Sequence, residues 1–246
     1  MRRTDSRERP AHTVAAGDVP AWRVDLFAPV ASFRDPLFPG VTRGLPVPPP
    51  STIRGLLAAA TGRDAEPTPL GIAAWAEGSG TDAETYHPIA ADRSNPPVRG
   101  RVRSGKGGMT LRDRPFLVGV YVRLWLPGQD GERVAAALRR PCWPLRLGRS
   151  QDVVHVLPQR AGARPTSARP VVLRPTGVAR VDHALAPVGG HAYGAVRLQR
   201  LAAGISTDRT STTWRDYLWC DRPTGGQAVE GAYEDEEGQA VWLLDP

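Results

Sequence analysis

The sequence contains little cysteine and no long apolar run. Two cysteines, Cys142 and Cys220, occur among its 246 residues, and neither has a partner at the spacing of a metal site. We therefore expect two free thiols in a reducing compartment. No apolar run reaches the ~18 residues of a membrane span, and the polar, charged start of the chain lacks the apolar centre of a secretory signal. These absences predict a cytoplasmic protein with no membrane partner.

Lysine is almost absent as well. Of the 32 basic residues only Lys106 is a lysine, and the formal net charge is +7 with an isoelectric point near 10.2. GC-rich coding accounts for arginine in place of lysine, but it does not account for the excess of positive charge. Such an excess favours a polyanionic partner, because contacts to phosphates release condensed counterions.

The signatures of common hydrolytic sites are missing. There is no HExxH pair and no GxSxG turn, and the glycine turn around Lys106 does not complete a GxxxxGK[ST] phosphate-binding motif. His155 alternates with Val154 and Val156, which favours a polar surface position for its ring over a role as a metal ligand. We therefore predict no metal and no other cofactor.

One set of residues could cleave RNA without a metal. Tyr86 or His87 would activate a 2′-hydroxyl as general base, and Lys106 would stabilise the phosphorane. These residues are near one another in sequence, but spacing alone does not demonstrate a site. The simpler interpretation is an aromatic residue beside a turn and a solvated lysine.

The first clear structural signal is a strand, a proline-rich loop and a helix. Trp22–Phe27 alternates apolar and polar side chains, which predicts a strand that continues to Arg34. Leu45–Pro50 is extended because its prolines fix φ and lack amide donors. Ser51 has the chemistry of an N-cap, and Gly62 suits the end of a short apolar helix.

The remaining pattern predicts an α+β fold of the ferredoxin-like type. Pro115–Pro127 is a near-continuous apolar run and is expected to be a central strand. The β–α–β–β–α–β order fits an antiparallel sheet with two helices on one face. The other expected elements are a strand or helix at Ile72–Glu77, a turn at Gly78–Asp82, a helix at Gly131–Arg140, a strand at Asp152–Leu157, and short strands beyond Pro170.

Two segments have the composition of RNA contacts. The stretch 92–114 is rich in arginine and glycine, which favours a protruding β-hairpin with its tip near Lys106, or else a disordered surface loop. The turn Leu147–Ser150 would present backbone amides together with Arg149, a combination that suits a phosphate. The simpler interpretation of this second segment is a tight turn with an exposed arginine.

Four pieces together resemble the Cas-five family, the RAMP proteins of type I CRISPR effector complexes (Cascade). They are Phe33–Arg34, Leu45–Gly62, Arg114–Leu124 and Leu147–Val154, in the family's order, and the form of the last piece is most similar to type I-B-like branches. The resemblance implies a modified ferredoxin-like (RRM/RAMP) domain at 21–164 with a basic hairpin thumb at about 92–114. A flexible N-terminus at 1–20 would precede it, and a small β-rich C-terminal extension at 165–246 would follow.

The resemblance also implies partners and contact residues. The protein would cap the 5′ handle of the crRNA in antiviral defence, contact the large and backbone subunits of Cascade, and meet target DNA indirectly through the complex. The residues implied to bind RNA are Arg34, Arg43, Ser51, Arg54, Arg99, Arg101, Arg103, Lys106, Arg112, Arg114, Gly148, Arg149 and Ser150.

A catalytic role is not the leading expectation. Members of the type I-C branch process crRNA with a Tyr, Lys and His set, whereas here Lys106 is followed by Gly107. We therefore predict a non-catalytic RNA-binding subunit. The alternatives are a metal-free endoribonuclease that processes pre-crRNA and a generic RNA-binding module outside CRISPR.

Overall fold

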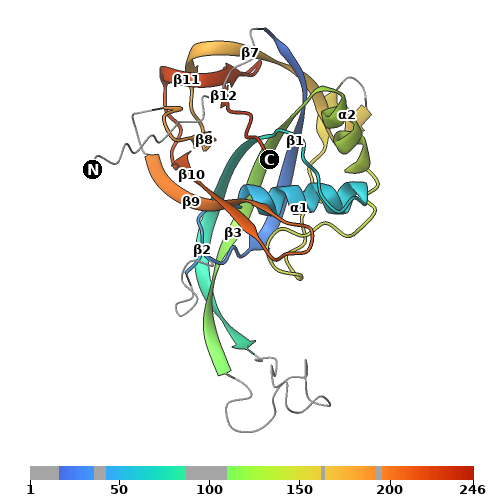
Figure 1. Cartoon of the computed structure of the whole chain (residues 1–246), viewed down its shortest axis with the longest axis vertical. Helices are drawn as coiled ribbons and strands as arrows, with labels where there is room; N and C mark the ends of the chain where they lie inside the picture. Colours follow the sequence, from blue (N-terminus) through green and yellow to red (C-terminus); the bar gives the residue numbers. More distant parts are fainter. Residues whose placement is uncertain (1–16, 36–42, 87–109, 162–163, 192–195) are drawn as a thin grey trace, which may run out of the picture.

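The computed structural model describes residues 17–35, 43–86, 110–161, 164–191 and 196–246. These residues form a seven-stranded sheet, a three-stranded sheet, a two-stranded hairpin and two helices (Figure 1). The helices are α1 (Pro50–Thr61) and α2 (Gly128–Ala137). The main sheet contains β1 (Val19–Ala31), β2 (Gly71–Tyr86), β3 (Thr110–Pro127), β4 (His155–Val156), β7 (Arg169–Arg180), β11 (Gly226–Glu234) and β12 (Ala240–Val241). The smaller sheets contain β8 (Leu185–Pro187), β9 (Val196–Ile205) and β10 (Thr212–Cys220), and β5 (Gln159–Ala161) with β6 (Arg164–Thr166).

The strand order of the main sheet confirms the ferredoxin-like prediction. The order is β12-β11-β7-β1-β3-β2, and β4 also pairs with β1. Both β4 and β7 lie antiparallel to β1 on the same side, β4 beside Leu26 and Phe27 and β7 beside Val19–Arg23. The fourth strand position of the fold is thus shared by two strands, with the β5–β6 hairpin between them in sequence.

The two helices cover one face of this sheet. Val24 and Leu26 of β1 and Leu124 of β3 join Ile53 and Leu57 of α1 in one buried cluster. Burying each of these side chains contributes roughly 1.5–3 kcal/mol. Figure 1 shows α1 lying across the strands, with α2 near the opposite end of β1 from the projecting ends of β2 and β3. No helix in the described parts of the chain combines the length and apolarity needed to cross a membrane.

The start of α1 differs from the prediction and its end agrees with it. The residue at the N-cap is Pro49, and the helix begins at Pro50, so the N-cap predicted at Ser51 is wrong. A proline fits the first helical position because its missing amide would have no partner there. Gly62 ends the helix in a left-handed conformation, with φ of 71°, as predicted.

Three further predictions need correction. The turn expected at Gly78–Asp82 is part of β2, which stays paired with β3 along its length. The strand expected at Asp152–Leu157 is reduced to the two residues of β4, because residues 147–152 form a turn tied to other elements. Helix α2 starts at Gly128, three residues before the predicted Gly131, directly after the strand that precedes it.

The C-terminal strands share the core of the preceding part. β7 and β11 continue the main sheet, and β9 contacts α1. Leu70 and Leu244 exchange backbone hydrogen bonds of 3.1 and 2.9 Å. Leu201 and Trp219 belong to the same buried cluster as residues of β1 and α1, so this cluster is shared by both parts.

Candidate nucleic-acid interface

The paired ends of β2 and β3 form two arms that project beyond the body of the molecule (Figure 1). Their register runs from Gly71 opposite Trp125 to Tyr86 opposite Thr110, so paired strands lead into the segment predicted to form the thumb. Arg112 is exposed on the β3 arm. The other predicted thumb residues, Arg99, Arg101, Arg103 and Lys106, lie outside the described residues, as does His87.

A buried carboxylate joins the end of β1 to the turn at residues 147–152. Asp152 is 3% exposed. Its Oδ2 accepts hydrogen bonds from the backbone amide of Ser32 at 3.0 Å and from that of Arg149 at 2.9 Å. The Leu147 amide donates to the Asp152 carbonyl at 2.9 Å and closes the turn. We call Ser32, Glu84, Arg114, Gly148, Arg149 and Asp152 the Asp152 junction.

Gly148 is required by the geometry of this junction. Its φ of +105° is a conformation that side chains rarely adopt. A Cβ at this position would lie 2.6 Å from the Ser32 carbonyl oxygen and 3.2 Å from Asp152 Oδ2. The glycine therefore lets the turn approach the end of β1 closely.

Arg149 links the turn to the β2 arm and is not an exposed cation. Its Nη1 donates to Glu84 Oε1 at 2.9 Å, and its Nη2 lies 3.0 Å from Asp152 Oδ1. Hydrogen bonding to the Asp152 carboxylate, with a further bond to Glu84, raises the pKa of Arg149. Its side chain is only 11% exposed, and its guanidinium is paired with the two carboxylates. These ion pairs hold the turn against the arm.

The same junction includes the base of the β3 arm. Arg114 Nε donates to Ser32 Oγ at 2.8 Å, and Ser32 Oγ donates to the Pro115 carbonyl at 2.7 Å. The structure thus brings together three predicted residues: Arg114, Gly148 and Arg149. Sequence reasoning missed Ser32, Glu84 and Asp152. Asp152 carried a signal, since an acid three residues after an arginine in a tight turn can bond back to it, whereas Glu84 becomes visible only from the strand register.

The loop that follows β1 places two more predicted arginines at the surface. Arg34 and Arg43 are exposed, and the Asp35 amide donates to the Arg43 carbonyl at 2.9 Å. Arg34 pairs with Gly44 in an isolated antiparallel bridge, so the two ends of the loop run side by side.

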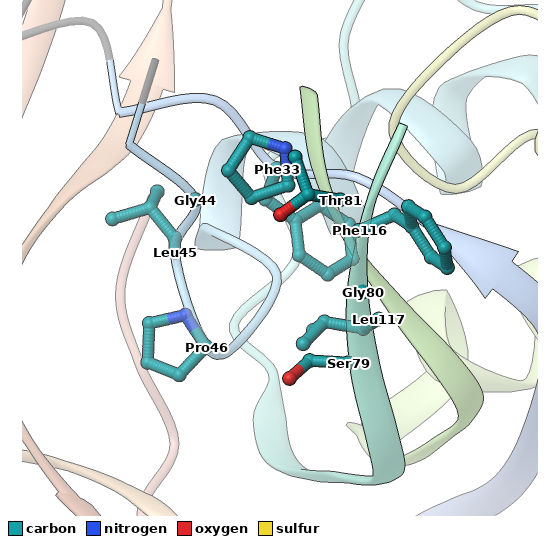
Figure 2. A pocket seen from close by; sticks show the side chains of 10 residues that line it. Phe33, Gly44, Leu45, Pro46, Ser79, Gly80, Thr81, Phe116 and Leu117 are labelled. Atoms are coloured by element: carbon teal, nitrogen blue, oxygen red, sulfur yellow. The ribbon is translucent and has the colours of Figure 1, made fainter. Parts of the chain in front are cut away.

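A cavity of about 460 Å³ separates this loop from the base of the arms. Figure 2 shows Gly44, Leu45 and Pro46 on one side of it and residues of β2 and β3 on the other. The lining residues are Phe33, Gly44, Leu45, Pro46, Ser79, Gly80, Thr81, Pro115, Phe116 and Leu117. This mixture of apolar surface, backbone groups and two hydroxyls, with no charged side chain, suits a flat uncharged group such as a nucleobase.

Arg54 belongs to the interior. It is 8% exposed, and its guanidinium donates to the carbonyls of Thr68 at 2.7 Å, Leu244 at 3.0 Å and Glu66 at 3.2 Å. Burial lowers the pKa of Arg54. The side chain ties α1 to the C-terminal residues, and the RNA-facing role expected for Arg54 does not fit this arrangement.

The two predicted serines lie in different elements. Ser51 is half-buried in the first turn of α1, away from the residues of the Asp152 junction in sequence and element. Ser150 is exposed in the turn, and its carbonyl accepts a hydrogen bond from Arg146 Nε at 2.6 Å. Of these two, Ser150 is adjacent to the junction.

The described residues contain no group of three or more His, Cys, Asp or Glu that could hold a metal ion. Cys142 is exposed and Cys220 is buried, and both are free thiols, as predicted. Tyr86 is the last residue of β2, while the other members of the possible ribonuclease set, His87 and Lys106, lie outside the described residues.

The family follows from comparison with known proteins. A family model described as CRISPR-associated protein (Cas_Cas5) matches residues 23–194, which is most of the chain and includes the Asp152 junction. The chain belongs to the Cas-five family. This match confirms the resemblance that the four sequence pieces carry.

A solved structure agrees on the fold. A chain of a structure titled "CRISPR RNA-guided surveillance complex" aligns with a TM-score of 0.53 at 18% identity, covering 89% of this Cas-five protein and 92% of that chain. A CRISPR protein from Archaeoglobus fulgidus aligns with a TM-score of 0.47 at 14% identity over 92% of this chain and 100% of that one. The search of curated proteins gave no match.

Proposed function

We propose that this Cas-five protein is a non-catalytic RNA-binding subunit of a type I Cascade. It caps the 5′ handle of the crRNA and contacts the large and backbone subunits. The observation that carries the proposal is the Asp152 junction, which holds a strand end, a glycine turn and the base of two projecting arms in one hydrogen-bonded unit. The match to a chain of an RNA-guided surveillance complex supports it.

Exposed arginines and the uncharged cavity would contact different parts of the RNA. Arg34, Arg43 and Arg112 are exposed on the segments that lead to the junction, and we expect them to contact phosphates. Phosphate contacts fix the position of an RNA but do not read its sequence. The cavity between the loop and the arms would receive an unstacked base, since sequence-specific RNA recognition targets bases that are splayed out.

Co-purified RNA tests this proposal directly. The tagged chain is expressed with its genomic neighbours and its own repeat–spacer RNA, and the RNA that purifies with it is sequenced. We expect a uniform RNA that begins with a short repeat-derived 5′ handle, together with a large and a backbone subunit. Random cellular RNA, or none, would contradict a role in Cascade and leave a generic basic module.

A matched pair of variants sharpens the same experiment. Arg34→Ala with Arg43→Ala should reduce the retained handle RNA, because both side chains are exposed beside the cavity. Arg200→Ala with Arg222→Ala removes two exposed arginines from the C-terminal part and serves as the control of equal charge. Equal loss in both pairs would mean that only overall charge matters.

Cleavage by the chain alone is a separate measurement. Repeat RNA is incubated with the purified protein and a chelator, and the ends of any products are analysed. We expect intact RNA. Fragments ending in a 2′,3′-cyclic phosphate would overturn the non-catalytic assignment and favour the metal-free endoribonuclease.

A further inference from the structure

A row of ring-bearing side chains crosses the main sheet on the face opposite the helices. Phe27 of β1 is the register partner of Tyr121 of β3, and Tyr121 is the register partner of Trp75 of β2. On the other side of β1, His155 of β4 is the register partner of Phe27. Register partners project from the same face of a sheet. We call Phe27, Trp75, Tyr121 and His155 the aromatic row.

Alternation along the strands shows which face carries the row. Leu26 and Ala28 flank Phe27 and are both buried in the core with the helices. Val120 and Val122 flank Tyr121 and belong to the same core. Because successive side chains of a strand point to opposite faces, the row lies on the side away from α1 and α2.

The rings are arranged as a continuous and partly open surface. The ring centroids of Phe27 and Tyr121 are 5.0 Å apart, and those of Trp75 and Tyr121 are 5.2 Å apart with planes only 10° from parallel. The His183 ring extends the row, 5.5 Å from Trp75. Phe27, Trp75 and Tyr121 are half-buried and His155 is exposed, so ring surface remains available to a ligand.

Polar contacts orient two rings, Tyr121 in the row and His183 beside it. The Tyr121 hydroxyl donates to Glu77 Oε1 at 3.1 Å. His183 Nδ1 lies 2.6 Å from Asp182 Oδ1, and the His183 backbone has a φ of 53°, a left-handed conformation that turns the chain beside β2. These two rings are therefore positioned by contacts within the protein.

The charges beside the row are already paired. Arg23 and Arg123 both contact Asp25, at 3.2 and 3.0 Å, and Arg23 also contacts Glu237 at 2.6 Å. Such a surface offers little to a phosphate, but it suits the flat and uncharged faces of nucleobases. Arg114 and Tyr121 both lie in β3, about 23 Å apart at ~3.3 Å per residue. The exposed Arg112 lies still further from Tyr121 along the same strand.

We propose that the aromatic row stacks unpaired bases of the RNA that this protein binds. Small four-stranded sheets with aromatic side chains on their central strands stack two or three bases of single-stranded RNA in this way. Every base has a π-face, so this contact is tolerant of sequence. The proposal rests on the proposed RNA binding and adds a second contact surface that is separate from the Asp152 junction.

The test measures affinity and its salt dependence together. The complex is assembled with Tyr121→Leu, which removes a ring and keeps an apolar side chain. Binding of the crRNA should weaken about ten-fold, the size of one lost base stack. The slope of log affinity against log salt should stay unchanged, because no phosphate contact is removed. Trp143→Leu is the matched control, since Trp143 is 62% exposed and lies outside the sheet.

A second measurement does not depend on a variant. The unmodified complex is irradiated with ultraviolet light, and cross-linked peptides are mapped by mass spectrometry. Cross-links from RNA to Trp75, Phe27 or Tyr121 are expected. They would support base stacking even if Tyr121→Leu unfolds the protein, and thermal melting of the variant detects that failure.

Three other outcomes are informative. Unchanged affinity in Tyr121→Leu without cross-links to the row, while Arg34→Ala with Arg43→Ala weakens binding, overturns the row and leaves the proposed function intact. Normal RNA binding with loss of another protein from the complex overturns the proposal, because the row would then be a protein contact. No crRNA in any preparation overturns the proposed function itself.

Discussion

The Asp152 junction and the aromatic row share two strands, β2 and β3, but differ in chemistry. β1 contributes Phe27 to the row, and Ser32, the residue directly after β1, belongs to the junction. β3 contributes Arg114 to the junction and Tyr121 to the row. β2 contributes Glu84 to the junction and Trp75 to the row.

At the junction, charged groups are closed onto one another by hydrogen bonds, while along the row apolar ring faces stay partly open. A charged side chain near a proposed RNA site therefore need not contact RNA. Arg149 is almost fully buried by its two carboxylates, so its contribution is to geometry. In the proposed binding mode, exposed arginines at the edges contact the phosphates, and the rings and the cavity contact the bases.

The largest expected effect comes from Asp152→Ala. This change removes the carboxylate that accepts hydrogen bonds from the Ser32 and Arg149 amides. The largely buried Arg149 guanidinium also loses one of its two carboxylate partners. Breaking a buried pair on one side costs about 3 kcal/mol of unfolding free energy. Chemical denaturation measures it, and the exposed Asp64→Ala is the control, expected to stay within ~0.5 kcal/mol. Similar losses in both variants would contradict a central role for the junction.

Gly148→Ala is expected to be next in size. The left-handed backbone alone costs a side chain roughly 1–2 kcal/mol, and the new Cβ would also lie 2.6 Å from the Ser32 carbonyl oxygen. We expect a loss of about 2 kcal/mol or more in unfolding free energy. Gly177→Ala is the matched control, because nothing lies within 4 Å of its Cβ position. If both variants unfold at the same denaturant concentration, the close approach of position 148 to the Ser32 carbonyl does not require glycine.

The strong periodic segments of the fold could be predicted from the sequence. Alternation in β1, the apolar run in β3 and the apolar stripe of α1 each reflect burial against the same core. The outer half of β2 could not be predicted from the sequence, because Gly78–Asp82 has the composition of a turn. It is extended because it pairs with β3. At Gly80 the absent side chain makes room for Phe116, since a Cβ there would lie 2.6 Å from its ring.

The candidate sites were predictable only where chemistry is local. The turn with Gly148 and Arg149 was recognisable as a tight basic turn, and His155 was correctly expected at the surface. Arg54 was misassigned, since sequence does not show that its guanidinium is enclosed by carbonyls. The aromatic row was invisible because each strand supplies one ring, and only the register brings the rings together.

The salt dependence of binding separates the two surfaces with a smaller effect. Each phosphate contact to single-stranded RNA contributes ~0.7 to the slope of log affinity against log salt. Arg34→Ala with Arg43→Ala should therefore reduce the slope by about 1.4 if each side chain contacts one phosphate. Arg200→Ala with Arg222→Ala should leave it unchanged. The proposed separation of phosphate and base contacts would be contradicted by a reduced slope in Tyr121→Leu. It would also be contradicted by an unchanged slope in the variant with Arg34→Ala and Arg43→Ala.

The smallest expected effect is a dependence of stability on pH beside the row. Burial would raise the pKa of Asp25, but hydrogen bonding from Arg23 and the charge of Arg123 outweigh it, so the pKa falls below its ordinary 3.8. A carboxyl whose pKa is lower in the folded state adds stability above the unfolded value. That stability is lost as pH falls through the lowered folded value. Unfolding free energy should therefore fall as the solution is acidified from about pH 5.

Asp25→Asn isolates this contribution. The variant should be less stable at neutral pH, because Arg23 and Arg123 lose a shared partner, and its stability should fall less steeply on acidification. Denaturation over a series of pH values measures both effects, with Asp64→Asn as an exposed control. Parallel curves for the unmodified protein and Asp25→Asn would show that Asp25 does not pair with the arginines beside the row. The face would then carry unpaired positive charge, and the row would have to be reconsidered as a phosphate-binding surface.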